Sequence, residues 1–267
     1  MIIGGKVFDF DSKPYIMGIL NMTPDSFSGD GNINNIDSAL KQVENMVQNG
    51  AAIIDIGGES TRPGHVKVTV NEELDRVSSI IELIKANFDV PLSLDTNKYE
   101  VAKEGIRLGV EIINDINALE DDRMAELVAQ SQVAVCLMHN KRIDNLPIIE
   151  GVISDLIKSV DKALKFGISK CKIIIDPGIG FEKDLQQNLQ IMNQLEKLLV
   201  MNYPILLGCS RKRIIGESLN LGIDEREEGT IATTIYGRMK GCSIFRVHNV
   251  CGNYRALQMY EKMESVN

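Results

Sequence analysis

Eight short apolar segments alternate with helix-like segments along the chain, and this alternation constrains the fold more than any other feature of the sequence. The second of them, residues 51–56, is apolar at almost every position, which is typical of a parallel strand covered by helices on both faces. The predicted strands are residues 15–20, 51–56, 91–95, 110–114, 133–138, 172–176, 204–208 and 242–247. Strict alternation of strands and helices predicts an α/β fold, a single-domain (β/α)8 TIM barrel that spans residues 1–267.

Local signals add two elements to this frame. Residues 1–10 have the pattern of a β-hairpin, which we expect to close the bottom of the barrel. Thr69 and Glu72 have the spacing of a capping box, so a helix is expected to begin directly after Thr69.

The sequence marks the ends of one loop and the starts of two helices less strongly. Residues 21–35 are polar and are expected to form a long loop without regular structure. The helix that follows the seventh strand is expected to begin near Ser210 or Arg211, and the last helix near Tyr254.

Composition excludes several classes of partner. The chain of 267 residues has 29 basic and 37 acidic side chains, a net charge of −8, which argues against a nucleic-acid or anionic-membrane partner. No apolar run approaches the ~20 residues that span a bilayer, and the N-terminus lacks the pattern of a signal peptide. The five cysteines are scattered without a CxxC pair, which predicts reduced thiols in a cytoplasmic protein.

Polar or ionisable side chains close most of the predicted strands. In a parallel barrel the carboxyl ends of the strands meet at one rim, where ligands bind. One such residue alone is equally well explained as a helix cap or a turn. Several at one rim indicate a site. The residues that close the strands are Asn21, Asp55, Asp95, Asn114, Met138, Asp176, Ser210 and Arg246.

These side chains divide by chemistry. Asp95, Asn114 and Asp176 are short donors and acceptors suited to the edge of a flat, nitrogen-rich heterocycle. Lys212 and Arg246 come from the other side of the predicted rim. Arg246 can lie flat against a ring and still reach a phosphate, whereas Lys212 acts as a point charge or a proton donor.

The loop of residues 57–64, GGESTRPG, indicates an anion site, because glycines admit close backbone approach and Arg62 offers a planar charged fork. With Thr61, Arg246 and His248 it would form a positive cradle suited to a diphosphate. The alternative is a surface turn with an incidental arginine.

A hard cation is the metal that this pattern favours. Mg²⁺ held by Asn21, diphosphate oxygens and water agrees with the few protein ligands that Mg²⁺ takes beside phosphate. Zinc is disfavoured, because His65, His139 and His248 follow strands that are far apart around a barrel rim.

Eight segments in collinear order resemble dihydropteroate synthase. They are MGILNMTPDSFS (17–28), GGESTRPG (57–64), SLDT (93–96), INDI (113–116), LMH (137–139), DPGIGF (176–181), SRKR (210–213) and RVHNV (246–250). The resemblance implies condensation of 6-hydroxymethyl-7,8-dihydropterin diphosphate with p-aminobenzoate, which gives 7,8-dihydropteroate and diphosphate in folate biosynthesis. It also implies a Mg²⁺ ion, a homodimer and a target of sulfonamides.

The resemblance assigns a role to each matching residue. Catalytic roles fall to Lys212, Arg246 and His248. The pterin-binding residues would be Asp95, Asn114, Ile116, Met138, Asp176, Phe181, Lys212 and Arg246. The diphosphate-binding residues would be Asn21, Thr61, Arg246 and His248, and Asn21 would also bind the metal. The p-aminobenzoate site would comprise Phe27, Thr61, Arg62, Pro63, Ser210 and Lys212, with Ser210 at a helix N-terminus.

Three places depart from the family pattern without removing a named ligand: Gly29-Asp30, Asn117 and HNKRIDN at 139–145. Two other functions remain open. A pterin-binding methyltransferase that serves a corrinoid protein shares the barrel and the Asp/Asn contacts, and a barrel could bind pterin without turnover. The diphosphate cradle favours the synthase over both.

Overall fold

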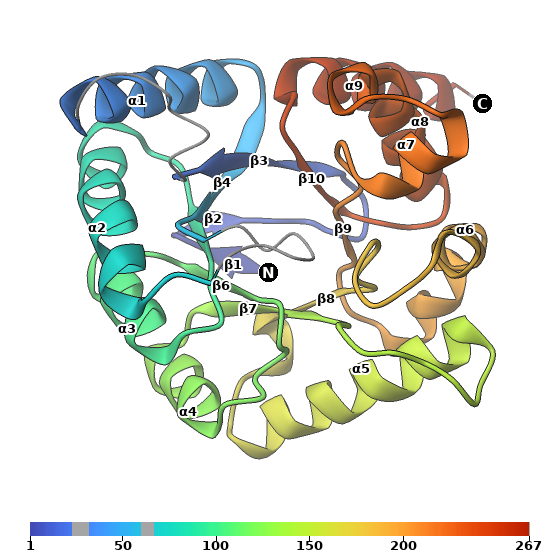
Figure 1. Cartoon of the computed structure of the whole chain (residues 1–267), viewed down its shortest axis with the longest axis horizontal. Helices are drawn as coiled ribbons and strands as arrows, with labels where there is room; N and C mark the ends of the chain where they lie inside the picture. The colour runs from blue at the N-terminus through green and yellow to red at the C-terminus, as the bar shows by residue number, and fades with distance from the viewer. Residues whose placement is uncertain (23–31, 60–66, 267) are drawn as a thin grey trace.

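The computed structural model describes residues 1–22, 32–59 and 67–266, and in it eight parallel strands form a nearly closed barrel within a ring of helices (Figure 1). The barrel strands are β3 (Tyr15–Asn21), β4 (Ala51–Gly57), β5 (Leu92–Asp95), β6 (Ile112–Asp115), β7 (Ala134–Met138), β8 (Ile173–Asp176), β9 (Leu206–Leu207) and β10 (Ile244–Val247). Their order in the sheet is β8-β7-β6-β5-β4-β3-β10-β9. Between β8 and β9 the barrel is closed by a single parallel bridge from Ile175 to Ile205. The predicted barrel is confirmed.

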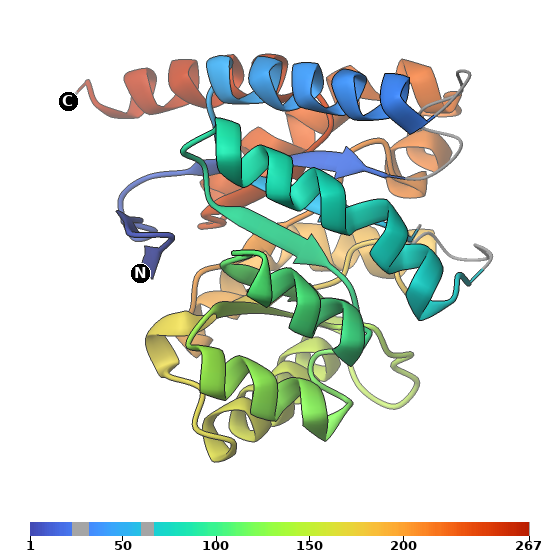
Figure 2. The same ribbon diagram turned by 90° about the vertical axis from the view of Figure 1, so that its left-hand side faces the viewer.

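Helices follow one another around the outside (Figure 2). They are α1 (Asn32–Gln48), α2 (Val70–Asn87), α3 (Tyr99–Arg107), α4 (Asp122–Ser131), α5 (Ile148–Lys165), α6 (Leu185–Asn193), α7 (Arg213–Leu219), α8 (Glu227–Met239) and α9 (Val250–Glu264). Short 3-10 helices are η2 (Lys170–Lys172), η3 (Leu195–Met201) and η4 (Ile223–Glu225). None of the described helices is both long and apolar enough to cross a membrane.

Alternate residues of each strand belong to two separate hydrophobic clusters. The inner cluster fills the barrel with Met17, Ile53, Ile112, Ala134, Cys136, Ile174, Leu206 and Ile244. Neighbouring positions such as Ile16 and Ile54 join a larger outer cluster that packs against the helices. Because side chains alternate along a strand, a residue two or four positions after an inner residue also faces inward. This period places Asn21, Asp55 and Asp176 inside the barrel.

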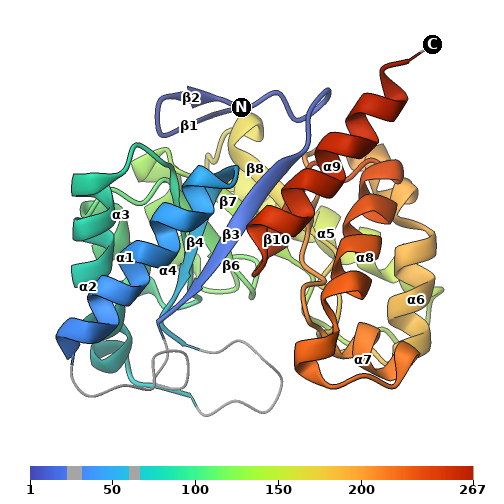
Figure 3. The same ribbon diagram turned by 90° about the horizontal axis from the view of Figure 1, so that it is seen from above.

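The N-terminal hairpin closes the barrel where its strands begin (Figure 3). β1 (Ile2–Ile3) and β2 (Lys6–Val7) pair antiparallel, and Ile3, Phe8 and Phe10 join the inner cluster. The predicted hairpin is therefore confirmed, and the polar strand ends lie at the opposite rim.

Side-chain caps mark the start of two helices, one as predicted and one earlier than predicted. Thr69 accepts the backbone N–H of Glu72, whose carboxylate accepts the N–H of Thr69, so the predicted capping box is present. Asn249 caps α9, which consequently begins at Val250 rather than near Tyr254.

Two other boundaries were predicted wrongly. α1 begins at Asn32, inside the expected loop of residues 21–35. The prediction placed the start too late because it relied on the apolar period that starts with Ile36. α7 begins at Arg213, not at Ser210 or Arg211, because Arg211 has a left-handed φ of +56° that is incompatible with a helix.

Candidate active site

Arg246 joins two buried carboxylates inside the barrel. Its Nε donates to Asp55 Oδ2 at 2.6 Å, and its Nη2 donates to Asp95 Oδ2 at 2.7 Å. The carboxylate side chains are 0% and 4% exposed, against 17% for Arg246. The arginine therefore fixes β10 against β4 and β5 and compensates two charges that would be costly to bury alone.

Asn114 extends this cluster to β6, since its Nδ2 lies 3.4 Å from Asp55 Oδ2. The second carboxylate oxygens, Oδ1 of Asp55 and Oδ1 of Asp95, are buried without a hydrogen-bond partner among the described residues. Buried acceptors of this kind are rare in folded proteins. They are available to a ligand that brings N–H or O–H donors.

Burial changes the protonation of the acids. Removal from water raises the pKa of Asp95 to about 7, against the opposing charge of Arg246, and the charge of Asp55 adds to the increase. Burial also raises the pKa of Asp176, with Lys212 opposing it. Asp95 and Asp176 both interact with Lys212 and Arg246, so all four side chains act within one electrostatic environment.

Lys212 connects the end of β9 to the loop after β8. Its Nζ donates to the carbonyl of Ile179 at 2.7 Å and lies 4.7 Å from the centre of the Phe181 ring. Burial lowers the pKa of Lys212, and the charge of Asp176 opposes that change. The ammonium group is thus held at the same rim as Asp176, as the sequence predicted.

Ser210 and His248 form a pair between the ends of β9 and β10. The Ser210 hydroxyl is 2.9 Å from His248 Nδ1, and it accepts the backbone N–H of His248 at 3.2 Å. The hydroxyl and the backbone contact together fix the orientation of the His248 ring at the end of β10.

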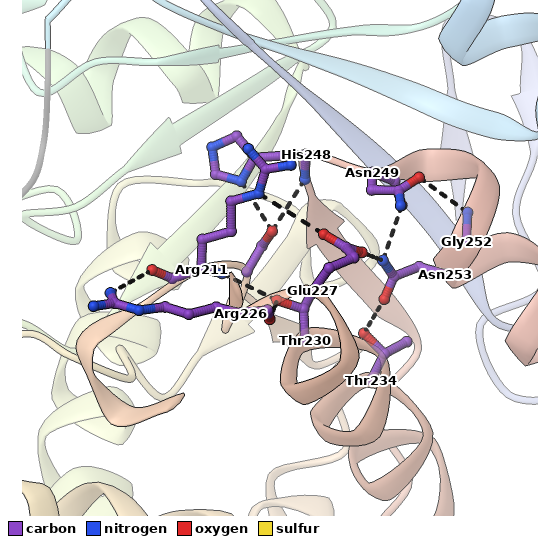
Figure 4. A network of polar contacts seen from close by, with 10 residues as sticks. Arg211, Arg226, Glu227, Thr230, Thr234, His248, Asn249, Gly252 and Asn253 are labelled. Atoms are coloured by element: carbon purple, nitrogen blue, oxygen red, sulfur yellow. Dashed lines mark hydrogen bonds and ion pairs between the residues drawn. The ribbon is translucent and has the colours of Figure 1, made fainter. Parts of the chain in front are cut away.

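A polar network holds this pair from behind (Figure 4). Arg211, with its left-handed backbone, donates its N–H to Thr230 Oγ1 at 3.1 Å, and its carbonyl accepts from Arg226 Nη1 at 3.0 Å. These contacts, from Arg226 directly before α8 and from Thr230 of α8, stabilise a conformation that is unfavourable for arginine. They therefore set the positions of Ser210 and Lys212 on either side.

Residues 17–248 match the profile of the pterin binding enzyme family. The dihydropteroate synthase of Clostridium beijerinckii is 50% identical over 97% of this chain and 97% of its own length. This chain belongs to the dihydropteroate synthase family.

Solved structures of dihydropteroate synthases share the fold closely. The enzyme of Clostridium difficile, solved with pteroic acid, has a TM-score of 0.94 and 45% identity, covering 96% of this chain and 99% of that chain. The enzyme of Xanthomonas albilineans, solved with 4-aminobenzoic acid, has a TM-score of 0.95 and 36% identity, covering 99% of this chain and 98% of that chain.

Within this dihydropteroate synthase fold, some predicted residues come together and others do not. Asp95, Asn114, Asp176, Lys212 and Arg246 converge through the contacts and shared electrostatics given above. Ile116 and Met138 line a cavity of about 230 Å³ toward α5, next to His139 and Asp155. That cavity is not lined by any of the five converging residues.

The predicted p-aminobenzoate site is only partly described. Phe27, Thr61, Arg62 and Pro63 lie outside the described residues. Ser210 is described, but it precedes a turn rather than a helix N-terminus, since α7 begins three residues later. The expected helix N-terminus at Ser210 was therefore wrong, and its hydroxyl is engaged by His248 instead.

Gly58 and Glu59, which follow β4, are held by charged side chains that the sequence analysis did not identify. Lys98 forms ion pairs with Glu59 and with the buried Glu73 of α2. Arg76 Nη1 donates to the carbonyl of Gly58 at 2.7 Å. Sequence reasoning missed these residues because charged side chains on helices usually face solvent.

Sequence reasoning also missed the roles of three other polar residues. Asp55 was recognised as a strand end but not as the partner of Arg246, and Lys183 and Asn188 were not singled out.

Among the described residues, no group of three or more His, Cys, Asp or Glu side chains is arranged to hold a metal.

Proposed function

We propose that this chain is a dihydropteroate synthase that joins 6-hydroxymethyl-7,8-dihydropterin diphosphate to p-aminobenzoate. The products are 7,8-dihydropteroate and diphosphate. The single observation that carries the proposal is the Arg246 bridge between Asp55 and Asp95, set beside Asp176 and Lys212 in a chain of this family.

The pterin ring would be bound by its edge. Asp95 and Asp176 would accept from ring and amino N–H groups, and Asn114 can both donate and accept. The unpartnered Oδ1 atoms of Asp55 and Asp95 support this assignment, because each lacks the donor that a pterin brings. The two carboxylates orient the plane of Arg246, which suits it to lie against the ring face.

The diphosphate would be bound by Arg246, His248 and Thr61. Ser210 supports this role of His248, because its hydroxyl lies 2.9 Å from Nδ1 and orients the ring. Positive groups placed where the leaving anion develops charge lower the barrier to its departure.

Mg²⁺ suits the donor available at the end of β3. Asn21 offers a hard amide oxygen, and a side chain at Gly57 would contact both Asn21 Oδ1 and Asp95 Cβ, so the oxygen faces the same space as the cluster. When bound, Mg²⁺ would neutralise charge on the diphosphate. Asn21 would hold the ion together with diphosphate oxygens and water.

The protein contributes to this reaction mainly by positioning the two substrates and by excluding water. The bond from the pterin methylene to the diphosphate oxygen breaks, and a bond from the methylene to the arylamine nitrogen forms. The nitrogen then loses its proton to the released diphosphate or to water. The electron-rich ring shares the positive charge of the methylene, so a neutral arylamine attacks without a strong base. Lys212 and Arg246 hold the two halves in place.

Four residues of the proposed p-aminobenzoate site are assigned from the family resemblance alone. Phe27, Thr61, Arg62 and Pro63 would border the arylamine, together with Ser210 and Lys212. Lys212 is suited to both halves, because its ammonium lies beside Phe181 while its backbone directly precedes α7.

We also propose a homodimer in the cytoplasm. Large apolar side chains are exposed on the last two helices, including Met239 of α8 at 63% and Met259 and Met263 of α9 at 59% and 55%. A face of this kind is typical of an interface. Sedimentation of the purified protein should give twice the chain mass of 29.6 kDa.

The activity is tested by incubating purified protein with pterin diphosphate, p-aminobenzoate and Mg²⁺. We expect diphosphate release that requires both organic substrates and falls to baseline in the Lys212→Ala variant. Release no greater than that of the variant would contradict the proposal. Methyl transfer from methyltetrahydrofolate would favour a methyltransferase instead.

A further inference from the structure

The loop between β8 and α6, residues 177–184, carries groups on which the proposed pterin site depends. Asp176 precedes it, the carbonyl of Ile179 accepts from Lys212, and the Phe181 ring lies beneath the same ammonium group. A shift of this loop would therefore move three contacts at once.

Lys183 fastens the loop to itself and to the neighbouring strand. Its Nζ lies 2.9 Å from the carbonyl of Phe181, 3.0 Å from that of Gly178 and 3.3 Å from that of His139. An ammonium group has three N–H donors, so these carbonyls use all of them. The third acceptor follows β7, so Lys183 joins the loop to the next strand of the barrel.

Asn188 fastens the same loop from α6. Its side chain is part of the buried polar set at 4% exposure. Its Oδ1 accepts the N–H of Gly180 at 2.7 Å, and its Nδ2 donates to the carbonyls of Asp184 at 2.7 Å and Lys183 at 3.2 Å. All three partners are backbone groups of the loop, so the amide acts as a clamp rather than as a cap alone.

The loop also touches the end of β7 directly. Gly178 has a φ of +68°, and a Cβ at this position would lie 1.9 Å from the carbonyl oxygen of His139. This oxygen is the one that accepts from Lys183. The close approach of Gly178 and the hydrogen bond from Lys183 thus involve the same carbonyl oxygen of His139.

We propose that Lys183 and Asn188 are positioning residues for pterin binding, which hold Asp176, the Ile179 carbonyl and Phe181 at a fixed spacing from Lys212. Neither side chain needs to touch the substrate. The proposal rests on the proposed function for its ligand, but its structural half, the clamping of the loop, does not.

The first test measures the clamp without substrate. Amide hydrogen exchange at Gly178 and Gly180 should become at least tenfold faster in Lys183→Met and in Asn188→Ala. Lys197→Met is the matched control, because it is the same substitution at an exposed lysine, whose Nζ donates to the side chain of Gln194 at 2.6 Å. Unchanged exchange in both loop variants would overturn the proposal.

The second test measures binding of 6-hydroxymethylpterin by calorimetry, without p-aminobenzoate. Both loop variants should raise the dissociation constant about tenfold or more, while Lys197→Met keeps the wild-type value. The KM for p-aminobenzoate at saturating pterin diphosphate should stay within twofold. Wild-type pterin affinity in both variants, or an equal loss for both substrates, would overturn the positioning role.

These results are separable from the proposed function. If wild-type protein releases no diphosphate, the function fails, whereas the exchange measurement still decides whether Lys183 and Asn188 clamp the loop. Asn188→Ala keeps the test decisive if Lys183→Met does not fold.

Discussion

Arg246 of β10 and Asp95 of β5 lie 2.7 Å apart, although β4 and β3 separate their strands in the sheet. The ion pair therefore crosses the inside of the barrel instead of following its wall. A contact of this kind depends on closure of the barrel, so it links the stability of the fold to the geometry of the site.

Loss of the Arg246 guanidinium should destabilise the protein strongly. Arg246→Ala leaves Asp55 and Asp95 buried without the guanidinium that pairs with both, which should lower the free energy of unfolding by about 3–5 kcal/mol. Arg123→Ala is the control, because Arg123 is 59% exposed and its pair with Asp121 is worth less than about 1 kcal/mol. Urea unfolding measures both, and equal small losses would contradict the account.

The raised pKa of Asp95 predicts how stability depends on pH. In the folded protein this pKa is about 7, above the ordinary value of 3.8, so between these values the folded state binds a proton that the unfolded chain has released. The contribution of Asp95 is complete below about pH 4 and is lost as the pH rises through 7. Relative to Asp95→Asn, the wild type should lose at least about 1 kcal/mol between pH 4 and pH 8.

Comparison with Asp95→Asn removes the contributions of groups outside the Arg246 cluster. Asp115, whose pKa is raised to about 6 by burial, titrates in both proteins and cancels in the difference. Chemical unfolding at pH 4, 5.5 and 8 gives the measurement. A stability difference that is the same at all three pH values would rule out the raised pKa.

Gly178 should tolerate no side chain. Gly178→Ala places a Cβ against the His139 carbonyl, so we expect a loss of more than about 2 kcal/mol of stability together with pterin affinity. Gly167→Ala is closely matched, because its φ is also positive, +92°, but no atom lies within 4 Å of the added Cβ. It should cost only about 1 kcal/mol. Thermal unfolding distinguishes the two, and equal effects would mean that the close approach is unimportant.

The Ser210 hydroxyl should matter for rate more than for stability. Ser210→Ala removes the partner of His248 Nδ1, and loss of one hydrogen bond of about 0.5–1.5 kcal/mol corresponds to roughly a two- to tenfold slower diphosphate release. Ser131→Ala, which removes a hydroxyl bonded to backbone on α4, serves as control. An unchanged rate in Ser210→Ala would show that His248 needs no orientation by the hydroxyl.

The rim of the site could be predicted because it follows from periodicity. Each strand is an apolar run that ends in a polar residue, and a two-residue period decides which side chains face inward. Asp95, Asn114 and Asp176 therefore required only the correct strand ends. The capping box of Thr69 and Glu72 was equally visible, because both partners lie within one helical turn.

Other features depend on information that local sequence does not carry. Nothing in the residue type of Arg211 predicts a left-handed backbone, so the start of α7 was placed too early. The partner of Arg246 is set by closure of the barrel, and the acceptors of Lys183 are carbonyl groups, which every residue has. Contacts with backbone atoms leave no pattern in a sequence.

The most direct test is a crystal structure of the protein with pterin diphosphate bound. The account predicts that the ring edge lies within hydrogen-bonding distance of Asp95, Asn114 and Asp176, and that the diphosphate lies beside Arg246 and His248. A ring bound away from these side chains, for example in the cavity between Ile116 and Asp155, would contradict it.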